Sequence, residues 1–479
     1  MAKLNQHLYI IRSEHMRKTT RYLFIIVTLF ILTSCRANDE KTYQEQAQSY
    51  LEDYKIPGMA MIVIEDGETS FIETLSSNTD KEYDTFETDS IFRTESISKT
   101  ITSFMVLRLI EQNILDLEDE VDTYLTNLDI PRGLTIKHLL THTSGLDIGA
   151  IGVHYHPESD YPSAKENIAS TLDFRFPINE TFFYSNVGYN FLELVIEEAT
   201  NKDFEENFQE LIGRPLNLSV SSFTYKEEYK DKYIGGYDLK GNYIPPYVYP
   251  DKASGGFLTN LQDMEKLLHL FLSPTILLDS TSNYLQTPLQ EVTGEYSLVS
   301  EGYSLGHFID GDVRFHGGQG HGWMAFFMVH DNGEDGLFMV TNSQRSYPMF
   351  SGMIALWEEK NEFENIGFST LSKLLPYLKG IGIIVVGVFI ALCVRYIRSL
   401  KERRWLTVRK LKCFSYLEFL ILLILTGFIL YLELANYVFL RVLYPNIMDR
   451  MMIVLIFYDI LLVFYFLKPK TKENVYVRD

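Results

Sequence analysis

The stretch Ser96-Ile97-Ser98-Lys99 begins a segment whose apolar residues recur at helical spacing. This spacing predicts a long amphipathic helix that opens at Ser96, with an apolar face made by Ile97, Ile101, Phe104, Met105 and Leu109. Residues three apart share one face of a helix, so the Lys99 amine can lie beside the Ser96 hydroxyl in the first turn. An isolated serine three residues before a lysine is also common, and a solvated first turn then explains it.

The chemistry that such a pair allows is nucleophilic catalysis. A serine hydroxyl is a poor nucleophile at neutral pH, so it needs a nearby base and donors for the oxyanion that forms on attack. Lys99 is the candidate base, because burial against an apolar helix face lowers the pKa of a lysine. The backbone N–H of Ser96, at the positive end of the helix dipole, is the candidate oxyanion donor.

A second motif, Tyr184-Ser185-Asn186, follows on a predicted loop. The Tyr184 phenol can act as a phenolate or as a relay that protonates a leaving group, and the Asn186 amide can position both Lys99 and a substrate. The alternative is that Tyr184 and its aromatic neighbours only pack the core, in a chain that contains 31 Tyr and 32 Phe.

A third motif, His316-Gly317-Gly318, is predicted to lie on an edge strand that faces the serine. Gly317 and Gly318 let a substrate backbone approach closely, and the N–H of Gln319 is the candidate second oxyanion donor. His316 and Gln319 would thus form part of the oxyanion and substrate wall. Together, the three motifs indicate a serine acyl-transfer enzyme.

In this order and at this spacing, the motifs resemble those of the penicillin-recognising serine hydrolases, on the branch that holds class C β-lactamases, D-Ala-D-Ala carboxypeptidases and related esterases. The similarity covers about residues 43–359 and includes Ile56-Pro57-Gly58, Ser254-Gly255-Gly256-Phe257 and the segment from Leu139 to Leu146. The resemblance implies an α+β fold of the β-lactamase/transpeptidase type, with an antiparallel sheet flanked by helices and an inserted helical subdomain. It also implies an acyl-enzyme at Ser96.

The third motif departs from the usual pattern of this family. The usual form is Lys-Thr-Gly, whose ammonium and hydroxyl bind a substrate carboxylate, whereas this chain has His316 and Gly317 at the first two positions. A histidine is mostly neutral near pH 7, so this carboxylate anchor is weakened and the motif resembles those of the esterases and D-aminopeptidases. Arg314 can supply the missing charge from the same strand face, or it is a surface residue at the strand edge.

Metal ions and cofactors are not predicted. His138 and His142 lie four residues apart and His154 and His156 two apart, but neither pair comes with the glutamate of a zinc-protease helix. His142 belongs instead to a Thr-His-Thr-Ser-Gly turn that the resembled family uses structurally. The glycine pairs lack the spacing of a phosphate loop, so nucleotide binding is not expected either.

Residues 1–35 are predicted to be a signal sequence. Basic residues precede an apolar run at 22–32, which is shorter than the ~20 residues of a spanning helix. The run ends at Leu32-Thr33-Ser34-Cys35, the pattern of a bacterial lipoprotein cleavage site, which would make Cys35 the lipidated N-terminus. An ordinary signal peptide with an incidental cysteine and an uncleaved anchor are the alternatives.

Three apolar segments in residues 366–479, at about 375–394, 414–432 and 451–467, are near the length that spans a membrane. Burial in a soluble core is the alternative, and the basic residues between the segments argue against it. The connection after the first segment and the tail after the third are both rich in lysine or arginine, which marks them as cytoplasmic. Residues 36–365 are therefore expected to face out of the cell from a multi-pass membrane protein.

Charge and cysteine content agree with this arrangement. The formal net charge is −20 although the predicted cytoplasmic connection is basic, so the outward-facing domain must be acidic. Such a domain disfavours nucleic acid as a partner and favours a neutral or cationic substrate. Of the 3 cysteines, none falls in residues 36–365, so that domain is expected to fold without an internal disulfide.

Two hairpins are predicted at the two ends of the domain. Residues 59–64 pair with 71–75 around Asp66-Gly67, and 323–330 pair with 337–341 across Asp331-Asn332-Gly333. Asn260 and Asp263 indicate the start of a helix between them. Strands at both ends predict one antiparallel sheet that the two termini complete.

The sequence thus predicts a membrane-bound serine hydrolase that forms an acyl-enzyme at Ser96. Lys99 is the expected base, Tyr184 the proton relay, and Asn186, His316, Gly318 and Gln319 the substrate-binding residues. Cell-envelope peptides that end in D-amino acids, β-lactams and esters are the expected substrates, and the sequence does not choose among them. The alternative is a penicillin-binding sensor that does not turn over its ligand and that signals through its membrane segments. Three spans are more than tethering requires, which favours this alternative.

Overall fold

The computed structural model describes residues 42–77, 86–149, 153–364, 366–370 and 456. Its chain divides into two units, Met1–Gln46 and Ala47–Asp479, and the sheet belongs entirely to the second. Within the described ranges, every helix is too short or too polar to cross a lipid bilayer. The predicted signal sequence with Cys35 and the three predicted spans lie outside these ranges, so they stay predictions.

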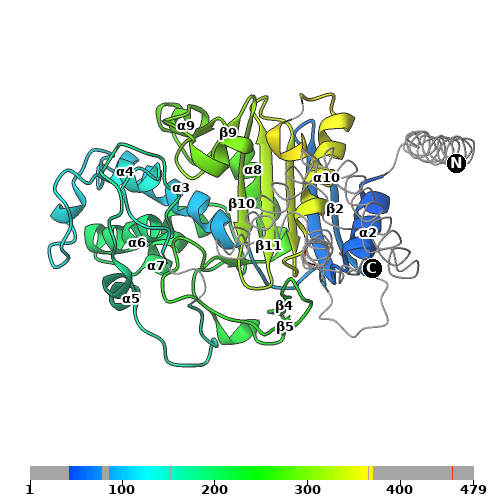
Figure 1. The fold of residues 1–479 in the computed structure, drawn as a ribbon, viewed down its shortest axis with the longest axis horizontal. Coiled ribbons are helices and arrows are strands. Elements are labelled where there is room, and N and C mark those ends of the chain that lie inside the picture. Colours follow the sequence, from blue (N-terminus) through cyan, green and yellow to red (C-terminus); the bar gives the residue numbers. More distant parts are fainter. Residues whose placement is uncertain (1–41, 78–85, 150–152, 365, 371–455, 457–479) are drawn as a thin grey trace, which may run out of the picture. The chain divides into compact units, whose positions relative to one another are not determined.

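One eight-stranded antiparallel sheet runs through the second unit in the order β2-β1-β12-β11-β10-β9-β8-β7 (Figure 1). The first and last long strands along the chain pair with each other, with Met59 opposite Thr341. This confirms the prediction that the two ends of the domain complete one sheet. The strands are β1 (Gly58–Glu65), β2 (Glu68–Ser76), β7 (Gln290–Glu291), β8 (Gly302–Tyr303), β9 (Phe308–Asp310), β10 (Val313–Gln319), β11 (Met324–His330) and β12 (Gly336–Thr341).

Both predicted hairpins are present. Asp66 and Gly67 have φ values of 54° and 79°, the left-handed backbone that a tight two-residue hairpin loop requires, and they join β1 to β2. β11 and β12 pair across the second predicted turn. All six residues of β12 are buried, so both faces of the sheet are covered there, and β12 contacts α8 (Leu261–Leu272) and α10 (Tyr347–Lys360).

A helical subdomain lies to one side of the sheet in Figure 1, with α3 (Ser98–Glu111) between the two. Within it, α6 contacts both α4 and α7, and α6 also contacts α3. The remaining elements of the described chain are α2 (Tyr43–Tyr54), α4 (Ile136–Leu140), α5 (Ala164–Thr171), α6 (Asn186–Thr200), α7 (Phe204–Phe208), α9 (Asp279–Gln286), the short helices η1 (Glu95–Ile97), η2 (Val121–Thr123), η3 (Gln209–Gly213), η4 (Glu227–Tyr229) and η5 (Gly294–Leu298), and the paired strands β3 (Phe92–Arg93) with β6 (Leu258–Thr259) and β4 (Gly236–Tyr237) with β5 (Tyr243–Ile244).

The prediction of an amphipathic helix that opens at Ser96 was wrong in two respects. Ser96 lies in the 3₁₀ turn η1, and the α-helix begins only at Ser98. The helix is also buried on nearly every side, because its small polar residues bond inside the protein. Thr100 donates to the Gly306 carbonyl at 2.7 Å, and Thr102 donates to the Ala253 carbonyl at 3.0 Å. Hydroxyls that resemble a solvent-facing stripe in the sequence therefore anchor α3 between the sheet and the subdomain.

The predicted helix start at Asn260 is confirmed. The Asn260 side chain accepts the Asp263 N–H at 2.9 Å and caps α8. Asp263 in turn accepts backbone N–H groups from Ser219, Val220 and Ser221, so that one carboxylate ties the start of α8 to the preceding subdomain loop.

Candidate active site

The structure brings Ser96 and Lys99 together at the junction of η1 and α3. The Lys99 Nζ lies 3.1 Å from the Ser96 Oγ, and it donates to the Asn186 Oδ1 at 2.8 Å and to the Ser254 carbonyl at 2.7 Å. Lys99 is fully buried, and this burial holds its pKa well below the ordinary 10.5. These three neighbours occupy the three hydrogen-bonding positions of the amine.

These contacts set the orientation of the neutral Lys99 amine. An amide oxygen and a peptide carbonyl only accept hydrogen bonds, so two N–H groups of Lys99 must point at Asn186 and Ser254. The third position, toward Ser96, is then the lone pair. A neutral Lys99 is therefore already oriented to take the proton of the Ser96 hydroxyl.

Glu95 fixes the backbone just before the nucleophile, and the sequence did not single it out. It has a φ of +51°, an uncommon value for a residue with a side chain, and it is buried. Its carboxylate accepts the Arg93 Nε at 2.8 Å, the Tyr247 hydroxyl at 2.8 Å and the Tyr249 hydroxyl at 3.0 Å. The Arg93 guanidinium also lies over both tyrosine rings. This buried network holds η1 in place.

Asn186 is the first residue of α6 rather than a loop residue, so the prediction of a loop was wrong at this position. Ser185 caps the helix by accepting the Gly188 N–H at 3.1 Å. The Asn186 N–H donates to the Ile148 carbonyl at 3.0 Å. A helix N-terminus is more rigid than a loop, which suits a residue that holds Lys99 in a fixed orientation.

Tyr184 lies over the amine and close to the nucleophile. The Lys99 Nζ is 4.9 Å from the centre of the Tyr184 ring, and Ser96 is near enough to the Tyr184 hydroxyl to lower the pKa of that phenol in part. Burial raises the pKa of Tyr184 well above 10, and the neighbouring Tyr296 raises it further. Of the two roles that the sequence left open, this environment favours a protonated phenol that donates over a phenolate that accepts.

The His142 ring packs against the Tyr184 ring, with 4.4 Å between the two ring centres. Its Nδ1 accepts the Ser185 N–H at 3.1 Å, so the ring proton is on Nε2, which donates to the Tyr303 hydroxyl at 3.1 Å. This agrees with the structural role predicted for the Thr-His-Thr-Ser-Gly turn. Within the described ranges, no three His, Cys, Asp or Glu residues gather closely enough to hold a metal ion, and the absence of a metal stays a prediction.

The third motif lies on β10, an interior strand of the sheet whose second half has a free side. β9 pairs only with the first three residues of β10, so from His316 onward the described sheet continues on the β11 side alone. A Cβ on Gly318 would lie 2.1 Å from the Thr94 carbonyl oxygen, so only glycine lets β10 pass this close to η1. The predicted edge that faces the serine is therefore present over this half of the strand.

The pairing of β10 also sets the direction of the Gln319 N–H. Gly320 donates to the Trp323 carbonyl at 3.0 Å, and alternate residues of an antiparallel ladder point the same way, so Gly318 and His316 also pair with β11. The Gln319 N–H consequently points away from β11, toward the free side of the strand. This is the direction that an oxyanion donor from β10 requires.

His316 is buried and neutral. Its Nδ1 lies 2.8 Å from the Gly317 carbonyl, which fixes the ring proton there, while its Nε2 has no partner among the described atoms. Burial, together with the nearby Lys99 charge, lowers the pKa of His316 to about 3. A neutral ring that offers an acceptor cannot replace the ammonium of the usual Lys-Thr-Gly motif as a carboxylate anchor.

Arg314 does not supply the missing charge, and it is not a surface residue. Its side chain is buried, and its Nε bonds to the Asp331 carboxylate at 2.8 Å. Its other nitrogens reach the Phe271 and Leu272 carbonyls at the end of α8. Both explanations from the sequence were therefore wrong: the arginine joins β10 to α8 and the β11–β12 turn.

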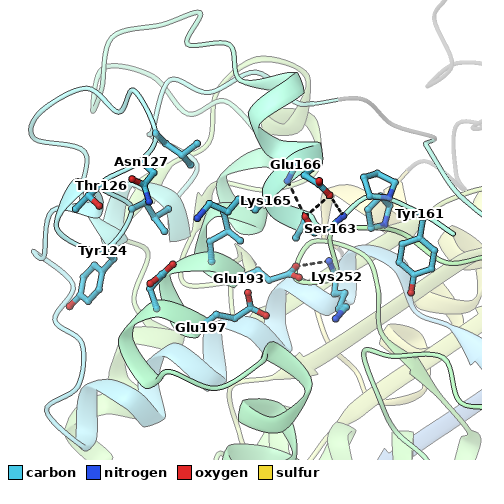
Figure 2. A pocket seen from close by; sticks show the side chains of 17 residues that line it. Tyr124, Thr126, Asn127, Tyr161, Ser163, Lys165, Glu166, Glu193, Glu197 and Lys252 are labelled. Atoms are coloured by element: carbon cyan, nitrogen blue, oxygen red, sulfur yellow. Dashed lines mark hydrogen bonds between the residues drawn. The ribbon is translucent and has the colours of Figure 1, made fainter.

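Two cavities flank α6. The smaller, of ≈ 60 Å³, is lined by Ser96, Asn186 and Gln319 together with Asn190 and Asp251. The larger, of ≈ 570 Å³, contains none of the predicted site residues. Figure 2 shows Glu193 and Glu197 of α6 on its wall, with Glu193 bonded to Lys252. Three of the predicted site residues thus line the smaller cavity, and none lines the larger one.

The comparisons with known proteins cover the same part of the chain. The family model described as Beta-lactamase matches residues 43–360, about two thirds of the chain. Protein flp of Staphylococcus aureus (strain NCTC 8325 / PS 47) is 23% identical over 312 residues, 61% of each chain. Penicillin-binding protein 4* of Bacillus subtilis is 31% identical over 174 residues, 35% of this chain and 38% of the relative. The chain therefore spans less than two thirds of these relatives.

Solved structures share the fold at low identity. The octameric penicillin-binding protein homologue from Pyrococcus abyssi matches with a TM-score of 0.54 at 23% identity, over 64% of this chain and 74% of the other. The D-amino acid amidase from Ochrobactrum anthropi matches with a TM-score of 0.53 at 18% identity, over 63% and 91%. At these identities the likeness concerns the fold, and it agrees with the predicted α+β class.

Proposed function

Because the chain belongs to the beta-lactamase family of serine hydrolases, we propose that it hydrolyses its substrate through a covalent acyl-enzyme at Ser96. The observation that carries the proposal is the buried Lys99 amine, whose two acceptor partners leave its third position to the Ser96 hydroxyl. A pKa held well below 10.5 makes the neutral amine accessible near neutral pH.

Acylation then follows in one sequence of proton and electron movements. The Ser96 Oγ forms a bond to the substrate carbonyl carbon while its proton passes to the Lys99 Nζ, and the carbonyl π electrons move to the oxygen. The N–H groups of Ser96 and Gln319 stabilise that oxyanion. When the carbonyl re-forms, the bond to the leaving group breaks, the Tyr184 hydroxyl protonates the departing atom, and Lys99 returns a proton to Tyr184.

Deacylation uses the same residues in reverse. A water molecule attacks the ester carbonyl of the acyl-enzyme, and its proton passes through the Tyr184 hydroxyl to the neutral Lys99 amine. When the carbonyl re-forms, the bond to the Ser96 Oγ breaks, Lys99 returns the proton to that oxygen, and the acid product departs. No class A deacylation glutamate is assigned in this scheme, so the same two groups serve both half-reactions.

The neutral His316 bears on the substrate class. A substrate that depends on a carboxylate, such as a penicillin or a terminal D-alanine, meets no cation at this position. Esters and amides that do not need this anchor are therefore the better substrates among the expected cell-envelope peptides, β-lactams and esters. The structural neighbour from Ochrobactrum anthropi is a D-amino acid amidase, an enzyme of the amide-cleaving class.

We also propose that the hydrolase domain faces out of the cell and is held by Cys35 and three C-terminal spans. The support is the sequence alone: the cleavage-site pattern before Cys35 and the basic residues that follow the first and third apolar segments. Metabolic labelling with palmitate is expected to mark the wild type and not Cys35→Ser. Protease added to intact cells is expected to degrade the domain, and full protection would overturn the orientation.

The experiment that tests the catalytic proposal is pre-steady-state hydrolysis of p-nitrophenyl acetate by the full chain in detergent micelles. The wild type is expected to release a burst of about one equivalent of nitrophenol and then turn over, and Ser96→Ala is expected to give neither phase. Turnover in Ser96→Ala at the wild-type rate would overturn the proposal. A burst without turnover, with an adduct that lasts many minutes, would replace it with the non-turnover sensor.

A further inference from the structure

Three polar residues that line the small cavity beside Ser96 have no role in the proposed catalytic steps. They are Asp251, Asn190 and Asn167, and together they form the polar wall of this cavity. The Asp251 carboxylate accepts one hydrogen bond from the Asn167 amide and one from the Asn190 amide. Both amide groups therefore direct their N–H atoms at one carboxylate.

The charge of Asp251 is not matched by a cation of the described chain. Burial raises its pKa, hydrogen bonds from Asn167 and the backbone lower it, and no positive side chain contributes. The adjacent Lys252 acts instead on Glu193 and Glu197, which follow Asn190 along α6. Glu95, which also lines the cavity, is already paired with Arg93. The cavity thus contains one carboxylate that lacks a counter-ion.

Asn190 provides a second and independent observation. Its side chain is only 4% exposed, its Nδ2 is used on Asp251, and its Oδ1 is buried without a hydrogen-bond partner in the described chain. A buried acceptor without a donor is unfavourable, so such atoms in folded proteins usually bind a ligand or water. The Asn190 oxygen needs a donor, and the Asp251 carboxylate needs a positive charge.

The position of this wall fixes which part of a substrate reaches it. Asn190 follows Asn186 by four residues on α6, so the two side chains lie about one turn, roughly 6 Å of rise, apart on the same helix face. Asn186 contacts Lys99, and all three residues Ser96, Asn186 and Asn190 line one cavity of ≈ 60 Å³. A group bound at Asn190 therefore belongs to the substrate whose carbonyl is at Ser96.

We propose that Asp251 and Asn190 form a subsite for a positively charged primary amino group on the acyl part of the substrate. An ammonium offers three N–H donors and one charge, which matches an acceptor oxygen and a carboxylate within a small cavity. The acidic character of the outward-facing domain favours approach of the same class of substrate. The inference rests on the proposed acyl-enzyme function of Ser96 and names the substrate class of that site.

The test compares esters that differ only in the amino group. The full chain in detergent is assayed with alanine methyl ester against methyl isobutyrate, and with methyl 6-aminohexanoate against methyl heptanoate, where a methyl replaces the ammonium. The Ser96→Ala rate is subtracted as background. We expect kcat/KM for the amino ester to exceed that for its uncharged counterpart by a factor of about 10 to 100 in one or both pairs. This is the factor that one charge-assisted hydrogen bond contributes.

Substitutions then assign the preference to the subsite. Asp251→Asn and Asn190→Leu are each expected to bring the ratio close to one. Asp129→Asn removes one negative charge at an exposed position far along the sequence from the cavity residues, and it is expected to leave the ratio unchanged. This control separates the local subsite from the net charge of the domain.

The outcomes distinguish the inference from the function on which it rests. If the uncharged esters are hydrolysed and the ratio is near one in every variant, the subsite is overturned and the acyl-enzyme stands. If Asp251→Asn and Asp129→Asn lower the ratio equally, net charge is responsible and the subsite is again overturned. If no ester is hydrolysed and Ser96 takes no covalent adduct, the proposed function itself fails.

Discussion

The Lys99 Nζ lies 3.1 Å from the Ser96 Oγ although the two residues belong to different helical segments, a 3₁₀ turn and the α-helix that follows it. The 3₁₀ turn is tighter than an α-helix, so residues three apart lie almost directly above one another. This alignment puts the serine hydroxyl over the amine while the amine stays buried. The pair therefore combines an accessible nucleophile with a desolvated base.

The pH dependence of acylation follows from the lowered pKa of Lys99. Because the base must be neutral, kcat/KM is expected to rise with pH and to level off well below 10.5, the ordinary value for lysine. His316, with a pKa of about 3, stays neutral across this range. The measurement is kcat/KM for p-nitrophenyl acetate between pH 5 and pH 10. A midpoint at or above 10.5 would contradict Lys99 as the base, and His316→Asn is expected to keep the wild-type midpoint.

The role of Tyr184 as a proton donor predicts a dependence on the leaving group. Tyr184→Phe removes the donor but keeps the ring against His142. A methoxide leaving group needs a proton and a p-nitrophenolate does not, so methyl esters are expected to lose about 10² in kcat/KM and p-nitrophenyl esters much less. Equal losses for both ester types would show that Tyr184 only packs the site.

The buried pair of Arg93 and Glu95 is expected to couple strongly. Glu95→Ala leaves the Arg93 guanidinium buried without its carboxylate, which costs about 3–5 kcal/mol in the free energy of unfolding. Arg93→Met combined with Glu95→Ala removes both charges and is expected to cost less than the sum of the single changes. Urea denaturation of the four proteins measures this cycle, and strictly additive costs would mean that the network is not a unit.

Glu193 gives a pH-dependent contribution to stability. It accepts the Lys252 N–H at 2.6 Å and the Ala253 N–H at 3.0 Å, next to the Ser254 carbonyl that binds Lys99. Burial raises its pKa to about 8, above the 4.5 of the unfolded chain. The folded state therefore binds the extra proton between these values, and stability falls as pH rises through that window.

The comparison with Glu193→Gln isolates this effect, because glutamine keeps an acceptor oxygen and does not titrate. Relative to this variant, the wild type is expected to lose on the order of 4 kcal/mol of unfolding free energy between pH 5 and pH 9. Thermal unfolding at each pH measures it. Parallel curves for the two proteins would contradict the raised pKa.

The parts of the fold that the sequence predicts are those with local codes. Asp66-Gly67 supplies the left-handed backbone of a tight hairpin, and Asn260 with Asp263 supplies a helix cap, so both could be placed before the structure. Helix α3 could not be described correctly, because Thr100 and Thr102 bond to carbonyls more than 100 residues away in sequence. A hydroxyl that is satisfied by a distant segment resembles a solvated one in the sequence.

The same distinction holds for the site. Ser96, Lys99, Tyr184 and Asn186 were predicted from short motifs, and the structure brings them into contact. Glu95 was missed, since a glutamate before a serine has no signature of its own until Tyr247 and Tyr249 fold over it. Arg314 was misplaced because its partner Asp331 belongs to the next hairpin turn. Contacts made by tertiary structure alone escape a motif search.

Covalent labelling of the full chain tests the central claim most directly. The protein in detergent is treated with a fluorophosphonate and, separately, with a fluorescent penicillin, and the adduct is located by intact-mass and peptide-mapping mass spectrometry. The account predicts a single adduct, on the peptide that contains Ser96, and none in Ser96→Ala with an unchanged circular dichroism spectrum. An adduct of equal yield in Ser96→Ala, or on any other residue of the wild type, would contradict it.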